Sequence, residues 1–415
     1  MKNLKSKLYK ILRRSEKYTK TDMVYLARGG FWLSLGKIVG TIASFLSALA
    51  FANLLPKEIY GTYKYILTLL GTLAIFTLPG MNTAIVQAVA RGYEGSFYQA
   101  FKTKLKWGCL GSLTAIILGL YYWYQGNIVL PIPLFLCAVF LPLMETSQIY
   151  ISLLGGKKLF SYQVKYSAIS RILSVTAMIA VLFLTDNLIW IITVYFISNT
   201  LINTFFYFFT KFKFRPNKKE DPQTLSYGKH LTLMSVIGII AGNLDKILLW
   251  HFFGAAQLAI FSFAYAPVNN ITKTFSSLKV LVLPKLSQRS IPELKQSAPG
   301  KALRFLIILV PIAIIYIFIA PYIYRYFFPQ YQSSVIYSQA LAFTILFPAI
   351  IPLTEIFKAH KRTKELYLFS TINPIFKIIL LILLIPPFGI WGLIITRLAQ
   401  WILEIIIVVI FFKEL

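Results

Sequence analysis

The sequence is poor in charged residues and poorest in acidic ones. Only 13% of its 415 residues are charged, and 14 acidic residues stand against 42 lysines and arginines. A soluble domain carries about 25% charged residues. This shortage argues against a soluble globular fold. The 57% of hydrophobic residues instead indicates an integral membrane protein.

Cysteine and histidine are also scarce. Both cysteines, Cys109 and Cys137, lie inside apolar runs, so no disulfide framework or metal motif is indicated. The three histidines are far apart in the sequence (His230, His251 and His360). We find no nucleophile elbow and no phosphate-binding loop. The sequence therefore indicates no enzyme, no metal site and no cofactor.

The chain shows no cleavable signal peptide, because no apolar region with a cleavage site follows the basic N-terminus. Residues 1–28 instead form a basic cytoplasmic segment, in which Leu4, Leu8 and Leu12 share one helical face. This pattern fits a helix on an anionic leaflet or a basic tail. Large outer loops are also missing apart from about 326–334, which disfavours a membrane glycosyltransferase or polymerase.

Apolar blocks long enough to cross a bilayer fill the rest of the chain. They predict an all-α membrane protein of about twelve transmembrane helices: 29–53, 58–81, 102–124, 129–153, 163–184, 188–209, 229–252, 256–280, 302–325, 335–357, 365–386 and 390–412.

The basic residues are distributed unevenly between the two sides of these spans. With a cytoplasmic N-terminus, 31 of the 42 lysines and arginines lie on the cytoplasmic side, and only Lys57 and Arg325 lie on the other. The positive-inside rule then places both termini in the cytoplasm. It also explains the net charge of +28 without a nucleic-acid partner.

The polar segment 210–228 divides the chain into an N-lobe (29–209) and a C-lobe (229–415), each with six spans. The first and seventh spans are similar: Gly40, Ser44 and Ser47 align with Gly238, Gly242 and Asp245 at a constant offset. With six spans per half, the two repeats run in the same direction. We therefore expect a parallel pseudo-repeat about an axis along the membrane normal.

Four segments carry a resemblance to a known family. They are AFANLLPKEIYGTYKYILTLLG (50–71), NLDKILLWHFFGAAQLAIFSFAYAP (243–267), FFPQYQSSVIYSQALAF (327–343) and TEIFKAHKRTKELYLFSTINPIFKIILLILLIPPFGIWGLIITRL (354–398). In this order and spacing the chain resembles the polysaccharide (O-antigen type) flippases of the multidrug/oligosaccharidyl-lipid/polysaccharide exporter superfamily. The likeness covers nearly the whole chain.

The resemblance implies two six-helix lobes in a V, a central cavity and alternating access. The substrate it implies is a polyprenyl-pyrophosphate-linked oligosaccharide for cell-surface polysaccharides such as lipopolysaccharide. The protein would then lie in a prokaryotic inner membrane, with a polymerase and glycosyltransferases as partners. Two alternatives stay open within the superfamily: a peptidoglycan-precursor flippase, or an ion-coupled drug antiporter.

Asp245 lies within the seventh span, 229–252. A charge at the centre of a membrane span costs at least about 2.5–3.5 kcal/mol, so its environment must offset that cost. Either a lysine neutralises the carboxylate as part of the architecture, or the carboxylate takes a proton or a metal ion such as sodium during transport.

Several other side chains are candidates for the cavity wall. Cations could hold a pyrophosphate through charge-assisted hydrogen bonds, and tyrosine rings could stack on sugars. Lys37 either reaches a phosphate or snorkels to the cytoplasmic interface. The predicted substrate-binding residues are Arg28, Lys37, Lys64, Asp245, Lys273, Arg397, Tyr63 and Tyr265. The excess of cations favours an anionic substrate over a cationic drug.

Other charges within spans are predicted to form structural pairs. Glu145 and Arg171 lie at matching depths on consecutive antiparallel spans, which predicts an ion pair within the N-lobe. Lys377 is expected to meet Glu404 in the C-lobe in the same way.

Overall fold

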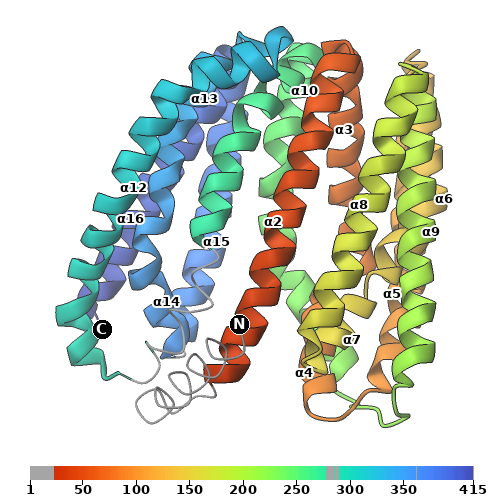
Figure 1. Cartoon of the computed structure of the whole chain (residues 1–415). Helices are drawn as coiled ribbons and strands as arrows, with labels where there is room; N and C mark the ends of the chain where they lie inside the picture. Colours follow the sequence, from red (N-terminus) through yellow and green to blue (C-terminus); the bar gives the residue numbers. More distant parts are fainter. Residues whose placement is uncertain (1–22, 277–285, 287–288, 361, 415) are drawn as a thin grey trace, which may run out of the picture. The chain divides into compact units, whose positions relative to one another are not determined.

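The structure is a computed structural model that describes residues 23–276, 286, 289–360 and 362–414, with the backbone alone at 23–31, 33–34, 363 and 413–414. The predicted basic segment 1–28 lies largely outside these residues. Every regular element that the structure describes is helical (Figure 1). The first half contains α2 (Met23–Leu54), α3 (Lys57–Leu73), η1 (Ala74–Thr77), α4 (Gly80–Ala90), α5 (Ser96–Tyr124), α6 (Pro131–Ser147), α7 (Tyr150–Gly156), α8 (Phe160–Leu184) and α9 (Leu188–Phe214).

The second half contains α10 (Thr224–Ser276), α12 (Ile291–Phe327), η2 (Pro329–Tyr331), α13 (Ser334–Leu341), η3 (Ala342–Ile350), α14 (Ile351–Ala359), α15 (Thr363–Phe388) and α16 (Ile390–Glu414). Across the described residues, 11 helical stretches are long and apolar enough to cross a membrane. Three of them are composite: α3 with η1, α6 with α7, and α13 through α14. The last two contain internal prolines, among them Pro142 and Pro348. Proline removes a helical hydrogen bond, which accounts for interrupted helices.

The element α10 accounts for the difference between 11 stretches and twelve expected spans. Its 53 residues include the predicted span 229–252 and residues 256–276 of the predicted span 256–280. A helix of that length would measure about 80 Å, far more than a hydrocarbon core of about 30 Å. The backbone breaks at Gly254, where φ is 77° and ψ is −174°, a conformation that glycine adopts readily. The prediction of an all-α fold with about twelve spans is confirmed.

Contacts within the chain define two compact units. Unit 1 comprises residues 1–48, 73–185 and 189–233, and unit 2 comprises 49–72, 186–188 and 234–415. The boundary thus falls inside α2, and α3 packs with the second half of the sequence. The linker 210–228 belongs to unit 1.

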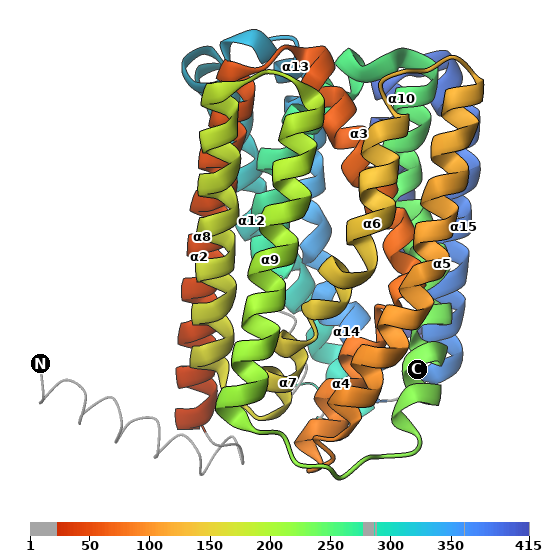
Figure 2. The ribbon, with the colours of Figure 1, turned by 90° about the vertical axis from the view of Figure 1, so that its right-hand side faces the viewer.

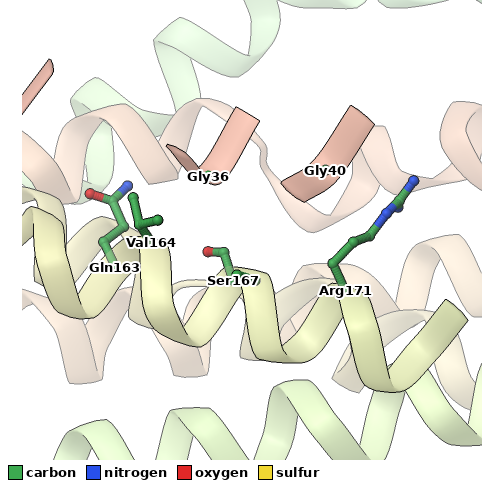
Figure 3. Close-up of a pocket in the computed structure, with 7 residues that line it drawn as sticks. Gly36, Gly40, Gln163, Val164, Ser167 and Arg171 are labelled. Carbon is green, nitrogen blue, oxygen red and sulfur yellow. The ribbon is translucent and has the colours of Figure 1, made fainter. Parts of the chain in front are cut away.

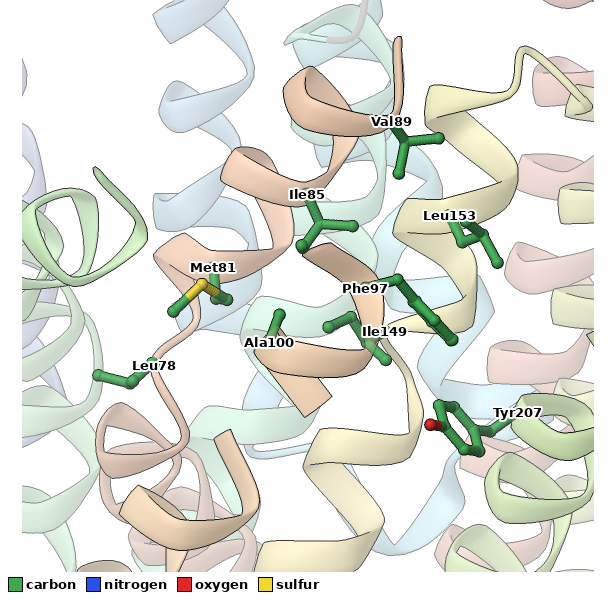
Figure 4. Close-up of a cluster of buried hydrophobic side chains, with 9 residues drawn as sticks. All are labelled: Leu78, Met81, Ile85, Val89, Phe97, Ala100, Ile149, Leu153 and Tyr207. Carbon is green, nitrogen blue, oxygen red and sulfur yellow. The ribbon is translucent and has the colours of Figure 1, made fainter. Parts of the chain in front are cut away.

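Unit 1 is built around a buried apolar cluster that α4 organises. The helices α4 and α7 lie beside one end of α9 (Figure 2). Side chains from α4, α5, α7, α9 and the residues just before α4 and α7 meet there (Figure 4), namely Leu78, Met81, Ile85, Val89, Phe97, Ala100, Ile149, Leu153 and Tyr207. Most of α4 lies between the predicted spans 58–81 and 102–124. It is a packed element because its apolar side chains, such as Met81 and Ile85, are fully buried.

The polar linker is folded against the α4–α5 turn. Arg91 pairs with Asp221 at 2.6 Å, and the Asp221 amide donates to the Ser96 hydroxyl at 2.9 Å. The Glu94 carboxylate accepts from the Asn217 amide at 3.0 Å and pairs with Lys157 at 2.7 Å. These contacts fix the segment that precedes α10.

We expect the contribution of Asp221 to stability to disappear in acid. The Gln223 amide, together with the Thr224 hydroxyl and Arg91, lowers the pKa of the Asp221 carboxyl below its ordinary value of 3.8. A group with a depressed pKa stabilises the fold above its unfolded-state pKa, and this stabilisation is lost as pH falls through the folded-state pKa. The difference in melting temperature between the wild type and Asp221→Asn should therefore be present at pH 6 and shrink below pH 4. An equal difference at both pH values would contradict this account.

In unit 2, buried polar side chains hold the second segment of α10. The Tyr324 hydroxyl donates to the Phe263 carbonyl at 2.8 Å. Ser334 and Ser338 donate to the Ile260 and Ala264 carbonyls at 2.9 and 2.8 Å. A buried polar group without a partner would be costly, so these bonds help to fix α12 and α13 against α10.

A close contact between two helices of unit 2 requires a glycine. A Cβ atom at Gly61 on α3 would lie 1.8 Å from the Ala255 carbonyl oxygen on α10. Because that atom is backbone, it cannot rotate away. We expect Gly61→Ala to destabilise the protein by about 3 kcal/mol, measured as thermal unfolding in detergent. Gly40→Ala is the control, because nothing lies within 4 Å of its added Cβ. Equal melting temperatures of Gly61→Ala and Gly40→Ala would contradict the close contact between Gly61 and Ala255.

Candidate functional site: a cationic cluster in unit 2

Asp245 on α10 is fully buried, with 0% of its surface exposed. One of its carboxylate oxygens, Oδ2, accepts from Arg397 Nη2 of α16 at 2.5 Å and lies 3.9 Å from Lys377 Nζ of α15. The other oxygen, Oδ1, accepts from the Lys246 amide at 2.8 Å. The carboxylate is thus neutralised by two cations from two other helices.

Two aromatic rings hold the guanidinium of Arg397. Its central carbon lies 4.1 Å from the centre of the Tyr265 ring and 5.8 Å from that of Phe261. These rings are parallel, with centroids 5.7 Å apart. Arginine over an aromatic face gains a cation–π attraction that is stronger away from water. Arg397 is therefore fixed by both Asp245 and Tyr265.

Further lysines surround this pair. Lys246 lies within electrostatic range of Arg397, Lys64 and Lys273. We call the set Lys64, Asp245, Lys246, Lys273, Lys377 and Arg397 the cationic cluster. It contains five cations and one carboxylate. Glu404 lies two turns further along α16, roughly 10 Å away in helical rise. The set as defined thus holds more cations than carboxylates.

The cluster also has unused hydrogen-bonding capacity. Arg397 Nε, Trp401 Nε1 and the Asn373 side-chain oxygen are buried without a hydrogen-bond partner. Buried polar atoms usually have hydrogen-bond partners. The two N–H groups can therefore donate to a ligand or a water molecule, and the Asn373 oxygen can accept from one. Within the described ranges, no three His, Cys, Asp or Glu side chains lie together as metal ligands. The chemistry that the cluster offers is anion binding.

The structure brings together five of the predicted site residues: Lys64, Asp245, Lys273, Arg397 and Tyr265. The other three lie elsewhere. Tyr63 is buried and stacks on Phe51 at 4.7 Å, Lys37 belongs to unit 1, and the side chain of Arg28 is outside the described residues.

The predicted pair Glu145–Arg171 is wrong. Arg171 donates instead to the Ser44 hydroxyl at 2.8 Å, and Glu145 accepts from Gln148 at 3.4 Å, with Lys104 as its nearest cation. Matching depth did not ensure that the two side chains face each other. Lys377, predicted to pair with Glu404, has Asp245 as an ion partner; its pairing with Glu404 stays a prediction.

Sequence reasoning missed Lys104. It lies near the start of the predicted span 102–124 and was not among the predicted site residues, yet only 1% of its surface is exposed, and its ammonium donates to the Asn82 side chain at 3.0 Å. The pairing of Asp245 with Arg397 could have been found. The two residues lie equally far from the outer ends of their predicted spans, 229–252 and 390–412.

Comparison with known proteins agrees with this architecture. The family model "Polysaccharide biosynthesis protein" matches residues 26–289. An uncharacterized membrane protein of Methanocaldococcus jannaschii is 24% identical over 91% of this chain and 83% of its own length.

Among solved structures, the lipid II flippase MurJ in an inward closed conformation superposes with a TM-score of 0.70 at 16% identity, covering 93% of this chain and 87% of that one. An inward-facing multidrug resistance MATE family transporter of the MOP superfamily also gives 0.70, at 11% identity, covering 93% and 98%. These likenesses concern the fold. The chain therefore belongs to the polysaccharide biosynthesis protein family, and its fold is similar to those of MurJ and of a MATE family transporter of the MOP superfamily.

Proposed function

We propose that this protein is a flippase for a lipid-linked oligosaccharide with an anionic, pyrophosphate-containing head group. The cationic cluster is the observation that carries this proposal. The cluster places five cations near one carboxylate in membrane-spanning helices of unit 2, and an anion would offset the cost of holding cations there. A pyrophosphate supplies both the negative charge and the acceptors for charge-assisted hydrogen bonds from arginine and lysine.

The family and the fold support the same substrate class. The matched family model concerns polysaccharide biosynthesis, and one structural relative is described as a lipid II flippase. We propose that the oligosaccharide serves cell-surface polysaccharide synthesis in a prokaryotic inner membrane. Glycosyltransferases would then supply the substrate, and a polymerase would consume it.

Transport requires that the cluster releases the head group as well as binding it. A ligand shifts a conformational equilibrium only by its differential affinity for the two states. In alternating access, the positive charge of the cluster would attract the head group in one state. In the other state the lysines would lie closer to Asp245, which would weaken that attraction. Imposing a proton or sodium gradient during the transport assay would show which ion, if either, couples to this cycle.

Transport of several substrates by the purified protein in liposomes tests the proposal. The panel is a polyprenyl-pyrophosphate oligosaccharide, lipid II and a cationic dye, each placed in one leaflet or compartment. We expect the pyrophosphate oligosaccharide to cross at least about tenfold faster than in protein-free liposomes. Faster transport of lipid II would indicate a peptidoglycan-precursor flippase, which the fold also accommodates. Transport of the dye alone would refute the proposal and indicate a drug antiporter.

A further inference from the structure

A cavity lies within unit 1, and none of the residues that line it belongs to the cationic cluster. Its volume is about 310 Å³, and it lies between α2 and α8 (Figure 3). Its walls are Gly36 and Gly40 of α2, and Gln163, Val164, Ser167, Ala168 and Arg171 of α8. All seven residues belong to unit 1.

Two glycines of α2 create this cavity. An added Cβ at Gly36 would lie 2.9 Å from the Val164 side chain, so the two helices are in close contact there. One turn further, nothing lies within 4 Å of an added Cβ at Gly40. The helices therefore meet at Gly36 and leave open space beside Gly40.

The polar side chains of the cavity come from a single face of α8. Gln163, Ser167 and Arg171 are spaced four residues apart, which places them on the same side of a helix (Figure 3). The Gln163 side-chain oxygen is buried and has no hydrogen-bond partner. The cavity thus offers a hydroxyl, an unused acceptor and a guanidinium.

Arg171 is an unusual residue for its position. It lies roughly 17 Å along α8 from Phe160, near the middle of a membrane-spanning helix of 25 residues. Its guanidinium donates to the neutral Ser44 hydroxyl at 2.8 Å. No carboxylate that the structure describes pairs with it. A cation at this depth is costly without an anion, and a guanidinium has five donors of which this bond uses one.

We propose that this cavity binds the phosphate group of a lipid. The Arg171 fork and the Ser167 hydroxyl donate to phosphate oxygens, a geometry that arginine matches closely. The Gln163 oxygen accepts from a hydroxyl on the same head group. Exposed apolar side chains on both helices, Ile42 and Ile172, provide a surface for the lipid tail. Two lipids share this chemistry, a polyprenyl phosphate carrier and a bilayer phospholipid. The site goes beyond the proposed transport function and does not depend on it.

Binding to the full-length protein in phosphatidylcholine nanodiscs tests this site. The probes are polyprenyl phosphate and phosphatidylglycerol, each titrated and measured by native mass spectrometry. Arg171→Gln is expected to weaken binding at least about tenfold, because a bond to a charged group is lost, and Arg171→Lys to restore part of it. Gly40→Leu should block binding by filling the open space, whereas Gly300→Leu, which also has nothing within 4 Å of its Cβ, should not.

The two probes distinguish the sources of the phosphate. Arg171-dependent binding of polyprenyl phosphate alone would assign the site to the carrier lipid. Arg171-dependent binding of phosphatidylglycerol as well would assign it to lipid phosphates in general. If neither probe binds, or if Arg171→Gln and Gly40→Leu both bind like the wild type, the proposal is overturned. Because the readout is binding, this result is independent of whether the protein flips an oligosaccharide.

Discussion

Replacing Asp245 by alanine should cost the protein about 3–5 kcal/mol of folding stability, because it leaves buried cations without their carboxylate. Arg397 and Lys377 lose their shared partner, which lies 2.5 and 3.9 Å from them. We expect a large drop in the melting temperature of the detergent-purified protein. The exposed Asp186, replaced by alanine, is the control and should change stability by less than about 0.5 kcal/mol.

A second substitution shows whether the stability lost in Asp245→Ala comes from unpaired cations or from a general packing defect. Combining Asp245→Ala with Arg397→Met removes the unpaired guanidinium and should recover most of the lost stability. Contacting charges are coupled, so the double variant should be more stable than the sum of the single changes predicts. If Asp245→Ala melts like the wild type, the carboxylate does not organise the cluster.

Replacing Lys377 by glutamine should reduce transport of the lipid-linked oligosaccharide at least about tenfold while leaving the fold intact. Asp245 keeps its closer partner, Arg397, so the architecture persists, but the cluster loses one charge that can bind the head group. A lost bond to a charged group is worth about 1.5–3 kcal/mol. The assay is transfer between leaflets in proteoliposomes.

The matched control for this variant lies on the same helix. Lys364→Gln removes an equal charge from an exposed position of α15 and should transport at the wild-type rate. Lys377→Arg keeps the charge and should retain more activity than Lys377→Gln. Equal loss in Lys364→Gln and Lys377→Gln would show that the effect is a general one of surface charge.

The lengths of the apolar blocks and the positions of the basic residues predicted much of the fold. The twelve spans are an example, because a bilayer fixes the length of a helix. Short buried helices were less predictable. The apolar run of α4 is too short to cross a bilayer, so α4 falls largely between two predicted spans, and yet it is buried. The backbone break at Gly254 lies between the predicted spans 229–252 and 256–280. Glycine tolerates the backbone conformation that this break requires.

The site was harder to predict because depth within the membrane does not fix the direction of a side chain. Equal depth would have paired Asp245 correctly with Arg397 but wrongly paired Glu145 with Arg171. Which face of a helix packs inward depends on its neighbours. Here Tyr265 under Arg397 and Ser44 beside Arg171 are contacts that the spacing of charges alone does not reveal.

The central claim is that the cationic cluster recognises the charge of the head group. The most direct test compares transport of two substrates, one with a pyrophosphate and one with a monophosphate but otherwise identical. Both rates are measured in the wild type and in Lys377→Gln. If the cluster binds the phosphates, the wild type prefers the pyrophosphate and the variant loses most of that preference. An identical ratio of the two rates in both proteins would contradict the claim.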